Sequence, residues 1–458
     1  MLDDAVNRAA TAHPEENTML DTWDELAHPD DLARVRDGSA DVAGRIRHAL
    51  RGLPFTPDER LTPVQPVALA EGVRRRMEDA AVRLVRLIER VCWSLSEDPA
   101  VLRDLVGLTP AQVPLLGAGG AAAERSRAGM LARPDVVVEN GRPRFLECNF
   151  GTADIGPVVA RHLTSAYGAL YRTAAERLAR PGAHQPYAGR AALFRRLCEE
   201  RGLPPKVAVV GTMREENVGD SRYFETEARY LRDHGFTSEF FEPEELQAAG
   251  SHWPVVVNHF IAAEWRRMGI PLDGMRRLHR QSVIVAPDAG MLLSSKLVLA
   301  WLSAGRFELS AAEAALVAEC VPWTRSLDKG TVVYDGREES LPELAIRRRE
   351  DLVLKPVGAF GGRDVVLGRS ADPAEWRARI ESAVAEGTHI VQELVRPDPL
   401  TVAFHDAAAG RLVRHPVSYV LGPYVVDGTP SGYMVRHAPS EVPSVVNFAR
   451  GASFNLGV

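Results

Sequence analysis

The sequence has 458 residues, of which 45% are hydrophobic and 25% charged. These proportions are typical of a globular protein with about three domains of about 150 residues each. The formal net charge of −6 argues against non-specific nucleic-acid binding. No apolar run reaches the roughly 18 residues of a membrane-spanning helix, so we expect neither a nucleic acid nor a membrane as partner.

The cysteines favour a reduced compartment. They lie far apart and form no Cys-x-x-Cys pair, which argues against a disulfide framework or a zinc site. The N-terminal residues lack a basic segment followed by an apolar core, so no export signal is expected. Together these features predict a cytoplasmic protein. The cysteines are Cys92, Cys148, Cys198 and Cys320.

Residues 1–115 are predicted to form a helical N-terminal region with a scaffolding role. Between residues 67 and 95, apolar side chains recur three and four positions apart, as on one face of a helix. The next segment, Gly117-Ala-Gly-Gly-Ala-Ala, fits the pattern of a dinucleotide-binding loop. Because Pro114 interrupts the strand that such a loop must follow, a loop of small residues is the preferred interpretation.

Residues 116–200 are predicted to begin the catalytic core with a β-hairpin that turns at an Asn-Gly pair. Glu147 and Asn149 lie two positions apart on its second strand, so both side chains leave the same face. Their oxygens are hard ligands that suit Mg²⁺, and the alternative is an ordinary solvated strand face. A polar loop with Thr152 follows, and then a helix over residues 157–180 and a linker at residues 181–186.

Residues 201–290 are predicted to form a doubly wound α/β domain that binds substrate. Buried strands at residues 206–211, 254–258 and 283–286 alternate with helices. Ligands are expected at the loops that follow such strands. One of these loops is crowded with polar side chains that suit a substrate cradle. They include Glu215, Asn217, Asp220 and Ser221.

Residues 291–458 are predicted to hold a nucleotide. Only four of the 55 basic residues are lysines, and Lys355 ends a short strand beside a loop with Gly361 and Gly362. Amides of a glycine loop and a nearby ammonium group can bind phosphate oxygens. A plain hairpin with a glycine bulge is the alternative. Lys296 lies in a predicted helix over residues 291–302.

The rest of this segment is predicted to complete an antiparallel sheet. Helices are expected over residues 311–319, 341–348 and 374–385, and strands over residues 389–395, 402–404, 411–420 and 433–437.

In their order along the chain, these motifs resemble the circularly permuted branch of the ATP-grasp ligases. That branch includes eukaryotic-type glutathione synthetase and the glutathionylspermidine synthetase relatives. Its acidic metal motif precedes its phosphate-binding lysines, as Glu147-x-Asn149 precedes Lys296 and Lys355 here. The resemblance spans residues 133–451 and implies an α/β, circularly permuted ATP-grasp fold.

The resemblance also implies a role for each motif. Arg436 and Lys355 would be catalytic, and Glu147 and Asn149 would hold Mg²⁺. The implied ATP-binding residues are Lys296, Lys355, Gly361, Gly362, Gln392, Glu393 and Val395, the last three in a hinge that binds adenine and ribose. The implied substrate-binding residues are Arg133, Thr152, Glu215, Asn217, Ser221 and Arg436.

Two positions depart from the family pattern. Ser221 replaces a glutamine in the substrate segment, which leaves the substrate open. The family places a glutamate metal ligand just after the second lysine, whereas residues 356–363 contain no carboxylate and Asp364 is the nearest one.

The function implied by the resemblance is an ATP-dependent carboxylate–amine ligase that uses ATP and Mg²⁺. It would join an amino acid, with the γ-carboxylate of glutamate as one candidate, to a second amino acid or amine through an acyl phosphate, releasing ADP and phosphate. The alternatives are a catalytically degenerate ATP-binding protein and a phosphotransferase to a small hydroxyl substrate. The expected partners are amino acids or short peptides, and a homodimer is left open.

Overall fold

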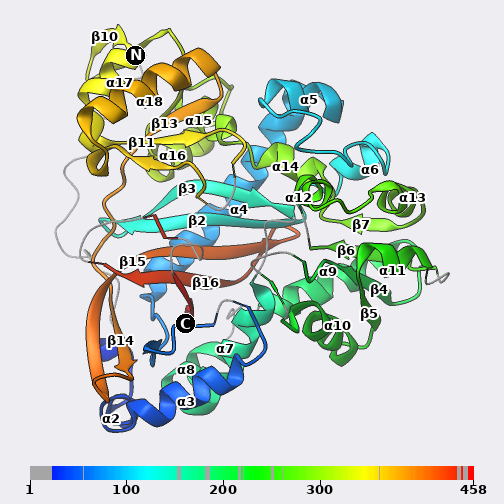
Figure 1. Cartoon of the computed structure of the whole chain (residues 1–458), viewed down its shortest axis with the longest axis vertical. Coiled ribbons are helices and arrows are strands. Elements are labelled where there is room, and N and C mark those ends of the chain that lie inside the picture. Colours follow the sequence, from blue (N-terminus) through cyan, green and yellow to red (C-terminus); the bar gives the residue numbers. More distant parts are fainter. Residues whose placement is uncertain are drawn as a thin grey trace.

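The computed structural model describes residues 23–54, 56–151, 156–180, 186–214, 218–219, 221–248, 252–259, 261–359, 362–440, 445–446 and 452–458. Within these residues, helices and strands are interspersed along the chain, and the strands form three larger sheets and a separate hairpin (Figure 1). This mixed α/β architecture confirms the predicted class at its coarse level. None of the described helices combines the length and apolar character needed to cross a bilayer.

The central sheet is built on the long strand β15 (Arg411–Val426). Its first half pairs with β14 (Thr401–Asp406), and its second half lies between β2 (Leu131–Glu139) and β16 (Thr429–Pro439). The pairings are antiparallel. The outer strands are β3 (Arg142–Phe150) beside β2, β17 (Ser453–Leu456) beside β16, and β1 (Leu61–Pro63) beside β14.

This sheet draws strands from three of the segments predicted as separate domains. β1 comes from the range 1–115, β2 and β3 from the range 116–200, and the others from the range 291–458. The predicted helical N-terminal region is therefore joined to the core by strand pairing. The domain boundaries themselves stay a prediction.

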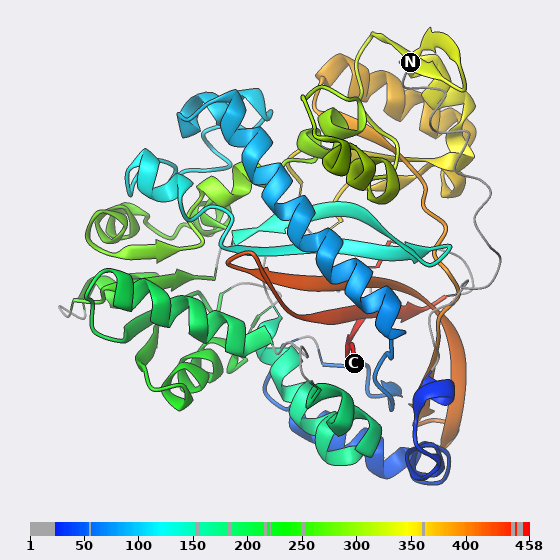
Figure 2. The ribbon, with the colours of Figure 1, turned by 180° about the vertical axis from the view of Figure 1, so that it is seen from behind.

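Helix α4 (Glu71–Leu95) crosses the back of the central sheet (Figure 2). Its predicted apolar face is confirmed, because Val73, Met77, Leu84 and Ile88 are at most 1% exposed. Burying each such side chain contributes roughly 1.5–3 kcal/mol. These contacts hold the helix against the sheet.

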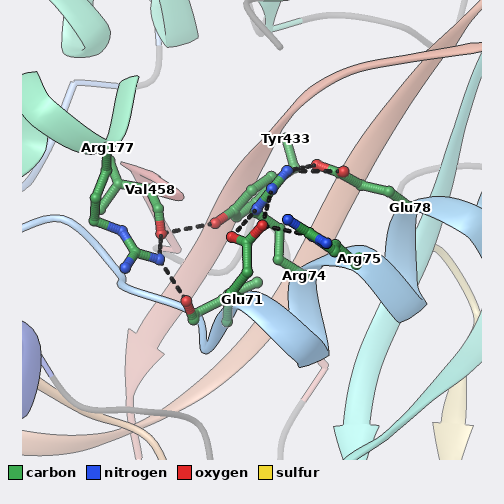
Figure 3. A network of polar contacts seen from close by, with 8 residues as sticks. Glu71, Arg74, Arg75, Glu78, Arg177, Tyr433 and Val458 are labelled. Atoms are coloured by element: carbon green, nitrogen blue, oxygen red, sulfur yellow. Dashed lines mark hydrogen bonds and ion pairs between the residues drawn. The ribbon is translucent and has the colours of Figure 1, made fainter. Parts of the chain in front are cut away.

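Polar contacts anchor the start of α4 (Figure 3). Arg74 donates to Glu78 at 2.9 Å. Nearby, the carbonyl oxygen of Val458 accepts hydrogen bonds from Arg177 at 3.0 Å and from the Tyr433 hydroxyl at 3.1 Å. This network fixes the helix start beside β16 and the end of β17.

The shorter helices of the first half surround this core. They are α1 (Trp23–Leu26), α2 (Pro29–Asp37), α3 (Ser39–Ala49), α5 (Pro99–Leu105), α6 (Ala121–Arg125), α7 (Pro157–Leu170), α8 (Arg172–Leu178) and α9 (Pro186–Glu200).

The single helix predicted over residues 157–180 is wrong in one respect, since it is two helices, α7 and α8. Tyr171 between them is extended, with φ −128° and ψ 128°. The Asp31 carboxylate accepts the amides of Arg172 at 3.0 Å and Thr173 at 2.7 Å, which caps the start of α8. The break between α7 and α8 therefore lies where Asp31, a residue far away in the sequence, contacts the chain. The predicted linker at residues 181–186 lies almost entirely outside the described residues.

A four-stranded parallel sheet confirms the α/β unit predicted in the middle of the chain. Its order is β5 (Thr237–Phe241), β4 (Lys206–Val210), β6 (Val255–Asn258) and β7 (Val283–Val285). The helices of this unit are α10 (Tyr223–Asp233), α11 (Pro243–Ala248), α12 (Ala262–Arg267) and α13 (Asp273–Gln281).

The third sheet contains the predicted strand, glycine loop and strand. β11 (Leu352–Pro356) pairs with β12 (Val366–Leu367) across that loop and with β13 (His389–Glu393), which pairs with β8 (Thr324–Ser326). The remaining elements are α14 (Ala289–Leu293), α15 (Lys296–Ser303), α16 (Ala311–Cys320), α17 (Leu341–Arg347), α18 (Pro373–Glu386) and the hairpin β9 (Thr331–Tyr334) and β10 (Arg337–Ser340).

Candidate active site

The β2–β3 hairpin supplies a polar face at the centre of the site. Its predicted Asn-Gly turn is confirmed, with left-handed φ values of 52° at Asn140 and 71° at Gly141. The turn sets a register in which Asp135 faces Glu147 and Arg133 faces Asn149. Residues that alternate along paired strands share a face of the sheet, so these four side chains lie together.

Arg436 on β16 extends this face. Its guanidinium forms an ion pair with Asp135 at 2.5 Å, and Arg133 lies 3.7 Å from the other oxygen of the same carboxylate. Gly422 on β15 makes room for this arrangement, because an added Cβ would lie 2.9 Å from Arg133 Cδ. The sequence motifs singled out Arg133 and Arg436, and carried no signal for Gly422.

Lys296 reaches the same face from a helix start. The single helix predicted over residues 291–302 is wrong here, because α14 ends at Leu293 and α15 begins at Lys296. Ser295 caps α15 through its side chain, which accepts from the Leu297 amide. From this first position, Lys296 Nζ lies 3.3 Å from Glu147 Oε2 and donates to the Ala359 carbonyl at 2.6 Å.

Lys355 approaches from β11 and is buried. Its Nζ donates to Gln392 Oε1 at 2.6 Å and to the Leu146 carbonyl, next to Glu147, at 3.2 Å. Gln392 in turn donates to Thr324 Oγ1 at 3.1 Å. Gln392 therefore orients the lysine through its side chain, a contact that the hinge motif did not suggest.

The charged groups of this cluster shift one another's pKa values. Burial alone would raise the pKa of Glu147, but the charges of Lys296 and Lys355 outweigh burial and hold that pKa at about 2. Burial lowers the pKa of Lys355 to about 8, with Glu147 opposing the change and Lys296 adding to it. Burial raises the pKa of Asp135, while Arg436 opposes the change and Glu147 adds to it. At neutral pH the two lysines thus face an ionised Glu147.

The glycine loop after β11 is docked at both ends. At Gly358, an added Cβ would lie 2.7 Å from both Gln112 Nε2 and Leu108 Cδ2, so these two side chains lie close against the loop. Gly362 has a left-handed φ of 67°, and Gly361 lies outside the described residues. Arg363 then pairs with Glu264 of α12 at 2.5 Å. The loop therefore spans from the lysine strand to the α/β unit.

The predicted adenine hinge follows β13. The Glu393 amide donates to the Trp323 carbonyl at 2.8 Å, and the Glu393 carboxylate lies 3.7 Å from Arg144 of β3. Val395 is buried. These residues thus link the glycine-loop sheet to the central sheet, and their contacts with a nucleotide stay a prediction.

The predicted substrate-binding residues of the two polar loops, after β3 and after β4, are only partly described. Thr152, Glu215, Asn217 and Asp220 lie outside the described residues. Ser221 is partly exposed before α10, and its hydroxyl accepts from the Tyr223 amide at 3.4 Å.

The dinucleotide-like loop has a structural explanation. The Glu124 carboxylate accepts the amides of Gly117 at 2.9 Å and Gly119 at 2.8 Å. These amides are the groups that would otherwise contact a pyrophosphate, so the preferred interpretation as a loop of small residues is consistent with the structure.

The residues present fit a polyphosphate. Among the described residues, Arg436 Nε is a buried donor without a hydrogen bond, and buried polar groups are normally satisfied. The site also sets two lysines and two arginines against the carboxylates of Asp135 and Glu147. An anionic ligand would therefore offset the excess positive charge.

The residues also fit a magnesium ion that a substrate helps to hold. No group of three or more His, Cys, Asp or Glu that could hold a metal occurs in the described part of the chain. Mg²⁺ usually takes one or two carboxylates and completes its shell with phosphate oxygens and water. Glu147 and Asn149 offer such oxygens, and the Asn149 amide nitrogen donates to the Arg133 carbonyl at 3.3 Å. Asp364, the alternative third ligand, is exposed in the glycine-loop turn.

No protein-family profile matches this sequence, and no curated protein sequence matches it. Among solved structures, the chain is similar to a glutathione synthetase-like effector from Globodera pallida in its apo form. The TM-score is 0.59 and the identity 12%, over 94% of this chain and 99% of that chain. The two proteins share a fold.

Two weaker similarities accompany this one and carry no argument. A protein from Methylobacillus flagellatus, provisionally named a gamma-glutamylcysteine synthetase, matches with TM-score 0.37 and 12% identity over 80% of this chain and 84% of that one. The D-cycloserine synthetase DcsG matches with TM-score 0.25 and 17% identity over 47% and 67%. The fold shared with the glutathione synthetase-like effector agrees with the expected fold at its coarse level. The ATP-grasp assignment, the circular permutation and the activity stay predictions.

Proposed function

We propose that this protein is an ATP-dependent carboxylate–amine ligase, which forms an amide bond and releases ADP and phosphate. The observation that carries the proposal is the convergence of Lys296 and Lys355 on Glu147. These residues come from a helix start, a strand of one sheet and a strand of another. The motif order and the fold shared with a glutathione synthetase-like protein support the same activity.

In this proposal the basic residues bind and orient the reactants. Lys296, Lys355 and the amides of the glycine loop offset the negative charge of ATP, and Glu147 and Asn149 hold Mg²⁺. Arg436 stabilises the charge on the group being transferred, and its contact with Asp135 fixes its direction. Arg133 holds the substrate carboxylate beside it.

The reaction needs a good leaving group on the carboxylate. ATP supplies a phosphoryl group to a carboxylate oxygen, and ADP leaves. The amine nitrogen then attacks the carboxyl carbon, loses a proton, and expels phosphate. The glycine loop excludes water, which would otherwise hydrolyse the acyl phosphate.

The identity of the carboxylate substrate is the more specific part of the proposal. We propose glutamate through its γ-carboxylate, or a γ-glutamyl dipeptide, because the Glu215-x-Asn217 segment resembles the family's substrate motif.

The test is ADP and phosphate release with a panel of amino acids and amines, compared among wild type, Lys355→Met and Glu147→Gln. Release that needs both an acid and an amine, and falls at least about a hundredfold in both variants, is expected. Lys329→Met is the matched control, because Lys329 is exposed outside the site. ATP binding without turnover for any pair would instead favour the degenerate ATP-binding protein. A stable phosphorylated product that needs no amine would favour the phosphotransferase.

A further inference from the structure

A second cavity lies at the opposite edge of the parallel sheet from the candidate active site. Its volume is about 340 Å³, and its lining includes Leu203, Pro254 and Ser282, which precede β4, β6 and β7. The other end of β7 faces the active-site hairpin, since Ala286 packs near Gly151 at the end of β3. The sequence motifs assigned no role to this edge.

Basic side chains from separate segments line the cavity. Arg127 follows α6, Arg201 follows α9, and Arg280 lies in the last turn of α13. Arg201 and Arg280 are exposed, and no aspartate or glutamate of the described residues is part of the lining. The cavity is therefore positively charged where it meets solvent.

Arg127 is the unusual member of this set. It is only 3% exposed, and its Nε has no hydrogen-bond partner in the described part of the chain. Burial lowers the pKa of Arg127 and the charge of Arg201 lowers it further, while the charge of Glu124 opposes the change. Two guanidinium groups therefore repel each other at the cavity wall, which an anion between them would relieve.

His279 adds two buried ring nitrogens. Its ring is 2% exposed, and neither ring nitrogen makes a hydrogen bond to a described residue. Its closest acid is Glu124, 4.0 Å away behind the lining, whose oxygens already accept the two glycine amides. Buried polar atoms usually have a hydrogen-bond partner, so these nitrogens are available to a ligand in the cavity.

We propose that this cavity binds a small oxyanion ligand, a phosphate or phosphate ester, independently of the Glu147–Lys355 site. The planar fork of arginine matches the oxygens of a phosphate. The cavity volume lies within the range of small-molecule sites. The ligand head group would contact Arg127 and His279, while Arg201 and Arg280 would hold it at the mouth.

The test is calorimetric titration with inorganic phosphate at constant ionic strength. Every protein carries Lys355→Met, so that phosphate binding at the proposed active site is weakened. We expect Arg201→Ala/Arg280→Ala to weaken phosphate binding by about tenfold or more. Arg266→Ala is the charge-matched control, because Arg266 is an exposed arginine of α12 outside the lining; it should bind as the Lys355→Met parent does.

Two outcomes overturn the proposal. One is the absence of phosphate binding in the Lys355→Met parent at millimolar concentration, and the other is equal binding by the double variant and the Arg266→Ala control. A parallel titration with succinate separates carboxylate from phosphate ligands, and tighter binding of succinate would reject the phosphate assignment. Because no readout depends on ligase activity, failure of this proposal and failure of the proposed function are distinguishable.

Discussion

Lys355 shows how a single side chain depends on residues remote in sequence. Its motif predicted a phosphate-binding ammonium group, but its pKa results from burial and from Glu147 and Lys296, which come from other elements. Its ammonium group donates a hydrogen bond to Gln392 Oε1 at 2.6 Å. The chemistry of this residue is therefore set by the site and not by the glycine loop alone.

The lowered pKa of Lys355 predicts a pH dependence. The group is charged below about pH 8 and neutral above it, so the affinity of the free protein for ATP should fall as the pH rises through about 8. Titration of ATP binding across this range checks the prediction. Lys355→Arg, whose guanidinium stays charged, should flatten the profile, and a flat wild-type profile would contradict the assignment.

A second prediction concerns the substitution of Gly422, which lies next to Arg133. Gly422→Ala would place a methyl group 2.9 Å from Arg133 Cδ, so Arg133 must move away from Asp135. We expect a loss of stability of about 1–3 kcal/mol and an increased KM for the acid substrate of the proposed reaction. Urea unfolding and steady-state kinetics measure the two effects.

Gly44→Ala is the matched control for that substitution. Gly44 lies within α3, and an added Cβ there meets no atom within 4 Å. Because alanine favours a helix over glycine by up to about 1 kcal/mol, this variant should be slightly more stable. If Gly422→Ala and Gly44→Ala had the same stability and the same KM, then Arg133 would not depend on the absence of a side chain at Gly422.

At the scale of elements, a buried ion cluster joins α9, α10 and the end of β6. Glu227 pairs with Arg190 at 3.0 Å and with His259, and both partners are also buried. Burial alone would raise the pKa of Glu227, but His259 and Arg190 outweigh burial and lower it from 4.5 to about 2. This cluster holds the two helices against the parallel sheet.

The cluster predicts a step in acid stability. Because the pKa of Glu227 is lower in the folded protein, its contribution is complete above about pH 4.5 and is lost as the pH falls toward about 2. The free energy of unfolding falls by up to about 3 kcal/mol over this range. Glu227→Gln should be less stable at neutral pH and lose less stability over this acid range. Urea unfolding at several pH values provides the measurement, and parallel pH profiles for the two proteins would argue against it.

At the scale of the whole molecule, α4 connects regions that the sequence separates. It packs against β3, β15 and β16 of the central sheet and against α16, the helix that precedes β8 of the third sheet. Strands from near the start and from the end of the described chain meet in the sheet that it covers (Figure 2). The helix therefore supports the hairpin that presents Glu147.

Truncation on α4 should destabilise the whole protein. Leu84 is fully buried, so Leu84→Ala should cost about 2–5 kcal/mol through the cavity it leaves. Asp79→Ala on the exposed face, where the carboxylate is 67% exposed, should change stability by at most about 0.5 kcal/mol. Denaturant midpoints compare the two, and a small effect at Leu84 would mean that the helix is not part of the cooperative core.

Local patterns in the sequence determined the elements whose cause is local. The apolar face of α4, the Asn140-Gly141 turn, the parallel strands of the α/β unit and the hairpin around the glycine loop were all predictable from the periodicity of apolar residues and from turn chemistry.

Contacts between residues far apart in the chain decided the rest. The Asp31 carboxylate breaks the helix at Tyr171, Gly422 makes room for Arg133, and the three arginines of the second cavity come from separate segments. The sequence motifs named candidate site residues, and their roles stay predictions. Only the tertiary structure decided which of them meet, because distance in space is set by packing and not by separation along the chain.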